Sequence, residues 1–238
     1  MWTKRQIKLY EQAAEHLYHI QRLAFQQAKG KTEYEIQQFI LQAFKQRNMK
    51  TSHPPIVAFN EHAAEPHYQP KSRGPRLQRQ TLVLIDLWAR MNEKKAPFAD
   101  ITWMGYYGTP PKKVKEIFGI VIKARDKGIN VIKQKLRKKQ LPTGSDVDIA
   151  TTNVLRKHNY MDYCKHRTGH SLGTTSPHGR YRAVVDKNKH QLHANLGYTI
   201  EPGLYLDGRF GVRSEVDFYV IKGQQLRISK KQTSITLI

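Results

Sequence analysis

Four apolar segments of this chain carry an acidic residue at a position that a β-strand would bury. They are TLVLIDLWA at 81–89 with Asp86, FADITWMGYYG at 98–108 with Asp100, GYTIEPGLYL at 197–206 with Glu201, and GVRSEVDFYVI at 211–221 with Glu215. A buried carboxylate is very costly unless a cation or hydrogen-bond donors face it. One such acid alone would suggest a buried ion pair, but four in comparable strands indicate a shared site.

Helical periodicity precedes the first pair of strands. Residues 4–29 place apolar side chains on one helix face, and Gly30 is typical of a helix end. Thr32 and Glu35 then have the spacing of a capping box, because a threonine side chain can cap the helix while the glutamate three residues later reaches back. The sequence therefore predicts two helices in a row.

Between these helices and the first acidic strand, residues 56–60 (IVAFN) predict a strand and the polar residues 61–79 predict a loop. A second pair of helices precedes the other acidic strands. The first is a long amphipathic helix over about 111–139. Ser145 or Asp146 can cap the second, which runs to about residue 159.

The order of elements is thus repeated, although the sequence is not. Two helices are followed by a hairpin that carries two carboxylates, and this happens twice. Asp207, Gly208 and Gly211 between the last two strands suit a hairpin turn. No interdomain linker stands out, so we expect a single α+β domain over residues 1–238.

His170 adds a different kind of donor to the four acids. It lies in a glycine-flanked segment, HRTGHSLG at 166–173. Hard divalent cations prefer carboxylate oxygens, and imidazole suits transition metals. Four carboxylates and one imidazole can hold two divalent ions if some carboxylates bridge them. Two such ions can generate a nucleophilic hydroxide and polarise a carbonyl group.

Seven ordered stretches resemble the M24 metallopeptidases, the pita-bread family that includes methionine aminopeptidase, aminopeptidase P, prolidase and creatinase. The stretches are TEYEI at 32–36, PHY at 66–68, LVLIDLWA at 82–89, ADIT at 99–102, HRTGHSLG at 166–173, TIEPGLYL at 199–206 and GVRSEVDFYV at 211–220. The resemblance runs from about residue 32 to 222. It implies a pita-bread fold, in which duplicated helix–helix–hairpin halves surround a curved antiparallel sheet and a dinuclear metal centre.

The resemblance also implies a role for each candidate ligand. Asp86 matches a ligand of one metal ion, and His170 and Glu201 match ligands of the other. Asp100 and Glu215 match the carboxylates that bridge the two ions. We expect Mn, Co or Zn as the metal, since this donor set suits all three.

Further site residues are implied beside the metal ligands. His67 matches a histidine that contacts the substrate or transition state, and His166 matches the first histidine of the family's HxxxH pattern. Arg213 matches an arginine that supports the site or binds substrate. A second site histidine usually follows HxxxH by seven positions. Pro177 has that spacing here, so His178 is predicted as a shifted substrate-contacting residue.

The chain also departs from the family pattern. SEVD at 214–217 stands where the family often has IEDD, so one acid beside the bridging glutamate is lost. Trp103 replaces a common arginine after DIT. We expect no separate N-terminal domain, which in aminopeptidase P and prolidase helps dimerisation and closes the substrate pocket.

The expected reaction follows from the branch that the motifs resemble. PHY, EPGLYL and GVRSE resemble the aminopeptidase P and prolidase side of the family. We therefore expect a Xaa-Pro aminopeptidase that cleaves the N-terminal bond of short peptides with proline in second position. The alternatives are prolidase activity, methionine aminopeptidase activity, creatinase-like C–N hydrolysis, and a non-catalytic module that binds RNA or the ribosome.

The net charge of the chain suggests which partners it can bind, and its cysteine content suggests in which cellular compartment it works. Lys and Arg total 41 against 19 Asp and Glu, a net charge of +22, and many lysines fall on the polar face of helix 111–139. This predicts weak, salt-dependent nucleic-acid contact without sequence preference. The single cysteine, Cys164, cannot form an internal disulfide, and no signal peptide or membrane-spanning stretch is found. We expect a cytoplasmic protein.

Overall fold

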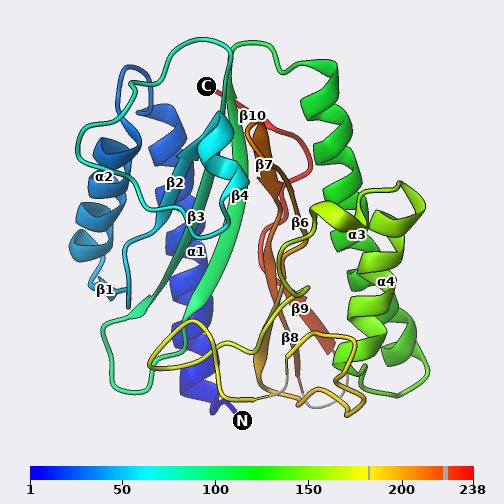
Figure 1. The fold of residues 1–238 in the computed structure, drawn as a ribbon. Coiled ribbons are helices and arrows are strands. Elements are labelled where there is room, and N and C mark those ends of the chain that lie inside the picture. Colours follow the sequence, from blue (N-terminus) through cyan, green and yellow to red (C-terminus); the bar gives the residue numbers. More distant parts are fainter. Residues whose placement is uncertain (182, 222–224) are drawn as a thin grey trace.

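Each half of the chain forms two helices before its pair of acidic strands, as expected (Figure 1). The helices are α1 (Lys4–Gln26), α2 (Glu33–Gln46), α3 (Lys112–Arg137) and α4 (Gly144–Lys157). The computed structural model describes residues 1–181, 183–221 and 225–238, so residue 222, at the end of the stretch that resembles M24 proteins, lies outside it. In Figure 1 the strands lie between the two helix pairs.

Local side-chain contacts explain where the helices begin. Thr32 and Glu35 form the predicted capping box at α2. The prediction for α4 was wrong by two or three residues, because the N-cap is Thr143 rather than Ser145 or Asp146. Asp146 is instead the third helical residue, and its carboxylate accepts a hydrogen bond of 2.8 Å from the Thr143 backbone N–H.

The first half forms most of one sheet. Its strands are β1 (Met49–Lys50), β2 (Ile56–Phe59), β3 (Thr81–Met91) and β4 (Ala99–Tyr107). β2 and β4 pair with β3 in antiparallel register. The predicted strand 56–60 ends one residue early because Asn60 has a left-handed backbone (φ 43°) and its side chain accepts the Leu82 N–H. A 3₁₀ helix, η1 (Asn60–Ala64), then replaces the start of the predicted loop.

The second acidic hairpin is present but interrupted. Its strands are β5 (Gly197–Ile200), β6 (Gly203–Leu206), β7 (Phe210–Arg213) and β8 (Val216–Ile221). β5 pairs with β8 and β6 with β7, in one continuous register: Ile200 lies opposite Val216, and Gly203 opposite Arg213. The two uninterrupted strands predicted for this region are therefore each divided in two, at the positions of Glu201 and Glu215.

Besides β1 and η1, three further short elements were not predicted. They are η2 (Met161–Tyr163), β9 (Gln225–Ile228), which pairs with β8, and β10 (Thr236–Leu237), which runs parallel to β4. Two-residue and four-residue strands carry too little periodicity to be recognised in a sequence. β10 places the C-terminal segment along β4, the strand that carries Asp100.

Both faces of β3 are covered, which explains its nearly continuous apolar run. Ile85 and Leu87 belong to the hydrophobic core that includes α1 and α2. Leu82 and Leu84 point to the opposite face and belong to the core under α3. Asp86 alternates with Ile85 and Leu87, so it lies on the α3-facing side, where the apolar core gives way to polar groups.

The outer face of α3 is basic, as the sequence predicted. Lys115, Lys123 and Lys127 are exposed on this helix. Nucleic-acid contact through this face stays a prediction. Within the described ranges, no helix combines the length and apolar character that a membrane crossing requires.

Candidate metal centre

The register of β3 and β4 places two acids on one face of the first sheet. Asp86 lies directly opposite Thr102, and Asp100 lies opposite Trp88. Residues that face each other across an antiparallel pair point to the same side. Asp86, Trp88 and Asp100 accordingly line one cleft, with a volume of about 370 Å³.

The interruption of the second hairpin brings the other two acids to the same cleft. Pro202 has no N–H for the ladder. Beside it, the Glu201 N–H donates to the Thr168 carbonyl (2.8 Å), and the Glu215 N–H donates to the Thr102 carbonyl (3.2 Å). Glu215 is thereby attached to β4. The break thus turns both glutamates toward the first sheet, and both line the cleft.

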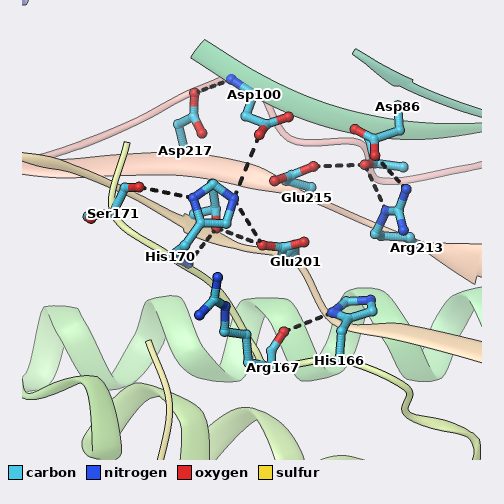
Figure 2. Close-up of polar contacts among 12 residues, drawn as sticks. Asp86, Asp100, His166, Arg167, His170, Ser171, Glu201, Arg213, Glu215 and Asp217 are labelled. Carbon is cyan, nitrogen blue, oxygen red and sulfur yellow. Dashed lines mark hydrogen bonds and ion pairs between the residues drawn. The ribbon is translucent and has the colours of Figure 1, made fainter. Parts of the chain in front are cut away.

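In Figure 2 His170 lies beside these acids, with its ring facing Asp100 and Glu201. Its Nδ1 is 3.0 Å from the Ser171 carbonyl oxygen, which can only accept, so Nδ1 carries the proton. Burial lowers the pKa of His170 to about 3, which leaves the ring neutral at neutral pH. The Nε2 lone pair therefore points at Glu201 Oε1 (3.3 Å) and Asp100 Oδ2 (3.7 Å).

A glycine allows this close approach. The neighbouring Gly169 pairs with Val184, and a Cβ at Gly169 would collide with the Thr199 carbonyl oxygen. The His170 N–H in turn donates to Thr199 Oγ1 at 3.0 Å. The glycine beside His170 thus has a steric function, since it brings the histidine loop against β5.

The donor set fits a divalent cation. Ligand atoms of Asp100, His170 and Glu215 lie within 4.8 Å of one another. Asp86 Oδ1 and Asp100 Oδ1 are buried and have no hydrogen-bond partner among the described residues. Burial and neighbouring carboxylates raise the pKa of Asp100 and of Glu215 well above the usual range. Such a cluster lacks a positive charge at its centre, which a metal ion would supply.

Arg213 compensates one side of this negative cluster. Its buried guanidinium forms an ion pair with Asp86 and donates to the Tyr205 hydroxyl (2.8 Å) and Thr102 Oγ1 (3.1 Å). Thr102 Oγ1 in turn donates to Glu215 Oε2 at 2.8 Å. Arg213 therefore holds Asp86 directly and Glu215 through one hydroxyl group.

Tyr205 and Thr102 were missed as site residues by the sequence analysis, although both lie in recognised motifs. Their positions alone carried a signal: Thr102 is two residues beyond Asp100 on β4, and alternate strand residues share a face. Tyr205 is on β6, opposite Gly211 and two residues beyond Gly203, which faces Arg213. Neither sequence position reveals the hydrogen bonds to Arg213.

His166 lines the cleft, but both of its ring nitrogens are engaged. Nδ1 lies 2.8 Å from the Arg167 carbonyl oxygen and so donates to it, and Nε2 accepts from the Tyr205 hydroxyl at 2.6 Å. Burial and the charge of Arg213 lower the pKa of His166 to about 4. The hydrogen bonds run from Arg213 to Tyr205 and from Tyr205 to His166, so this histidine orients the tyrosine hydroxyl.

His67 and His178 lie at the mouth of the same cleft, and both are exposed. The His178 ring lies 4.1 Å from the His170 ring, measured between centroids. The one-residue shift is accommodated by a turn in which the Gly173 N–H donates to the Pro177 carbonyl. His178, rather than Pro177, therefore lies beside the candidate ligand, with the two rings tilted by 55°.

Trp103 and Cys164, which the sequence also singled out, make their contacts within the fold and not with the candidate ligands. Trp103 points away from the cleft and packs against Tyr18 of α1, with ring centroids 5.4 Å apart. The Cys164 thiol donates to the backbone carbonyl of His166 (3.3 Å), and burial raises its pKa.

Comparison with known proteins identifies the family. The model of metallopeptidase family M24 matches residues 8–222, which adds α1 to the stretch recognised from motifs. This chain belongs to metallopeptidase family M24. It is 35% identical over 193 residues to a protein of Staphylococcus aureus (strain USA300) described as an uncharacterized peptidase. That match includes 81% of this M24 chain but 51% of the relative, so the chain spans about half the length of such curated relatives.

Solved structures show the same fold. A prolidase from Thermococcus sibiricus has a TM-score of 0.87 and 27% identity, over 100% of this M24 chain and 62% of its own. An X-Pro aminopeptidase from Thermotoga maritima MSB8 has a TM-score of 0.88 and 28% identity, over 100% of this chain and 64% of its own. The expected pita-bread fold is confirmed.

The stability of the metal-free chain should fall as pH rises from about 6.5 through about 7. Glu201 has its pKa raised to about 7 by burial, and the pKa values of Asp100 and Glu215 are also raised. The unfolded chain therefore releases protons that the folded chain keeps, and the free energy of unfolding decreases as pH rises. The lowered pKa values of His166 and His170 act in the opposite direction, but only below about pH 6.5.

Urea unfolding in the presence of EDTA at pH 6.5, 7.5 and 8.5 measures this effect. Saturating divalent metal should abolish or reverse the decrease, because metal binding displaces the same protons. Metal-free stability that is flat or increases over this range would contradict the raised pKa values of the acidic cluster.

Proposed function

We propose that this chain is the catalytic domain of a dinuclear metal-dependent exopeptidase, a Xaa-Pro aminopeptidase that removes the first residue of short peptides. The observation that carries the proposal is the convergence of four carboxylates and the neutral Nε2 of His170 in one cleft. The likeness to proteins described as a prolidase and an X-Pro aminopeptidase supports it.

In this proposal the metals are held as the motifs imply. Asp86 would bind one ion through Oδ1, since its Oδ2 is engaged by Arg213. His170 and Glu201 would bind the other ion. Asp100 and Glu215 would bridge the two. When bound, two divalent ions such as Mn, Co or Zn lower the pKa of water and polarise a peptide carbonyl.

The chain's own residues would position the substrate. His67 and His178 lie at the mouth of the cleft, beside the ligands rather than among them, and can hydrogen-bond the peptide. Arg213 and Tyr205 hold Asp86 and His166 in place, so we assign them a supporting role.

The cleft also suits proline. Ile56, Pro66 and Trp88 line it together with the acids and provide an apolar wall. A proline ring has no N–H to satisfy and presents apolar carbons to such a wall. A peptide with proline in second position can therefore place its ring there without burying an unpaired donor.

A peptide panel tests the function. One preparation, loaded in turn with Mn, Co and Zn, is given Xaa-Pro, Xaa-Pro-Xaa and Met-Ala-Ser peptides, and the products are identified by mass spectrometry. We expect cleavage after the first residue of Xaa-Pro-Xaa. Cleavage of the dipeptide alone would identify a prolidase, and preference for the Met peptide would indicate methionine aminopeptidase activity. No hydrolysis by metal-saturated protein would refute the proposal.

Replacing His67 or His178 by alanine should lower turnover by roughly 10²–10⁴-fold while metal content stays near that of wild type. The reason is that both side chains lie beside the candidate ligands but outside the proposed ligand set. The measurements are kcat, KM and metal content by elemental analysis.

The matched control is His19→Ala, which removes an exposed histidine of α1 that pairs with Glu15. Unchanged turnover in His178→Ala would assign that residue a structural role and leave His67 as the candidate. Loss of metal from either variant would instead place that histidine among the ligands.

A further inference from the structure

Arg125 of α3 is a fully buried arginine that lies outside the cleft. Its Nη1 donates to Ser214 Oγ (2.7 Å) and to the Gln232 carbonyl (2.8 Å), while Nε and Nη2 donate to Asp126 Oδ1. Burying a guanidinium is costly, and hydrophobic packing alone does not require one. Its hydrogen bonds join three segments that are far apart in the sequence.

Gln232 continues this connection into the first sheet. Its buried side-chain amide accepts from the Met104 N–H (2.8 Å) and donates to the Met104 carbonyl (2.6 Å). It therefore occupies the edge of β4 as a neighbouring strand would. β10 continues along the same edge, where Thr236 pairs with Gly105.

The segments joined in this way carry the two proposed bridging ligands. Ser214 immediately precedes Glu215, and its N–H donates to the Pro202 carbonyl, next to Glu201. On the other side, β4 carries Asp100 and also Thr102, whose carbonyl and hydroxyl both bond to Glu215. Arg125 and Gln232 thus connect the strand of one bridging carboxylate to the residue beside the other.

We propose that Arg125 and Gln232 are positioning residues for the metal centre: they fix the separation of Asp100 and Glu215 from outside the cleft. Two carboxylates that bridge the same ions must be held at one spacing, and residues that orient ligands typically change metal affinity by about 10–100-fold. This inference rests on the proposed function, because it assumes that the cleft binds metal.

The test measures Mn²⁺ affinity by isothermal titration calorimetry on the full chain. Ser214→Ala removes one hydroxyl from the connection, and Gln232→Met removes the amide at similar volume. The matched control is Glu116→Gln on the same helix, because Glu116 is exposed, pairs with Lys113 and has no contact with Arg125, Ser214 or Gln232. We expect at least about 10-fold weaker Mn²⁺ binding for the first two variants and wild-type binding for the control.

The outcomes separate the two proposals. If wild type binds no Mn²⁺, Co²⁺ or Zn²⁺, the proposed function fails, and this inference fails with it. If wild type binds metal and Ser214→Ala and Gln232→Met bind it equally well, with only a lower melting temperature, the positioning role is overturned while the function stands. Should Gln232→Met fail to fold, Ser214→Ala decides the question, because it makes the smaller change.

Discussion

Replacing Glu215 by glutamine should abolish metal binding and hydrolysis and at the same time stabilise the metal-free protein. In the absence of metal, burial and the charges of Glu201 and Asp86 oppose ionisation of Glu215. The neutral amide has nearly the same shape, removes this penalty and still accepts the hydrogen bond from Thr102. With metal present, the variant loses a carboxylate that both ions are proposed to share.

Thermal unfolding with EDTA and with excess Mn²⁺ measures both effects. Wild type should gain about 2.7 kcal/mol at a metal concentration of 100 times Kd, whereas Glu215→Gln should gain nothing. Glu116→Gln, on the exposed surface of α3, is the control and should respond to metal as wild type does. A Glu215→Gln variant that is less stable than wild type in EDTA, or that keeps its response to metal, would contradict the assignment.

Replacing Arg213 by methionine should destabilise the protein by about 3–5 kcal/mol, because it leaves Asp86 as a buried charge without its partner. The same change removes a donor from both Tyr205 and Thr102. Thr102 would then hold Glu215 less firmly, so metal affinity should fall as well. Arg213→Lys should not restore wild-type stability, since a single ammonium group cannot reproduce the geometry of the guanidinium contacts with Asp86, Tyr205 and Thr102.

Urea unfolding at pH 7 measures the loss of stability. Arg5→Met is the matched control, because Arg5 pairs with Glu93 on the surface with 78% of its side chain exposed. Such exposed pairs contribute about 0–1 kcal/mol, so the control should unfold almost as wild type does. A loss for Arg213→Met as small as that of the control would show that the buried pair contributes little to the fold.

Several parts of the site could be predicted because local rules determine them. Acids within apolar strand segments identified Asp86, Asp100, Glu201 and Glu215, since a buried charge leaves few alternatives. The glycine-flanked loop identified His170. The break in the second hairpin was not predicted, although Pro202 was visible, because the acceptors that replace the ladder come from Thr168 and Thr102, far away in the sequence.

The roles of the residues around the metal ligands depend on contacts between distant parts of the sequence. His166 was predicted as a site residue from its motif, but its hydrogen bond with Tyr205 through Nε2 joins residues that are 39 positions apart. Arg125 was not singled out in the sequence, which carries no signal for its contact with Ser214, 89 residues away. Hydrogen bonds between distant segments follow from packing geometry, which no periodicity encodes.

The sequence by itself determined the order of helices and hairpins, the family, and the acids and histidine that can bind metal. These follow from periodicity, capping and the free-energy cost of burying charge, all of which act over a few residues. Only the tertiary structure decided which oxygen atoms remain free and which are already engaged. Asp86 offers Oδ1 because Arg213 takes Oδ2, and Gln232 holds β4 because the C-terminal segment folds back onto it.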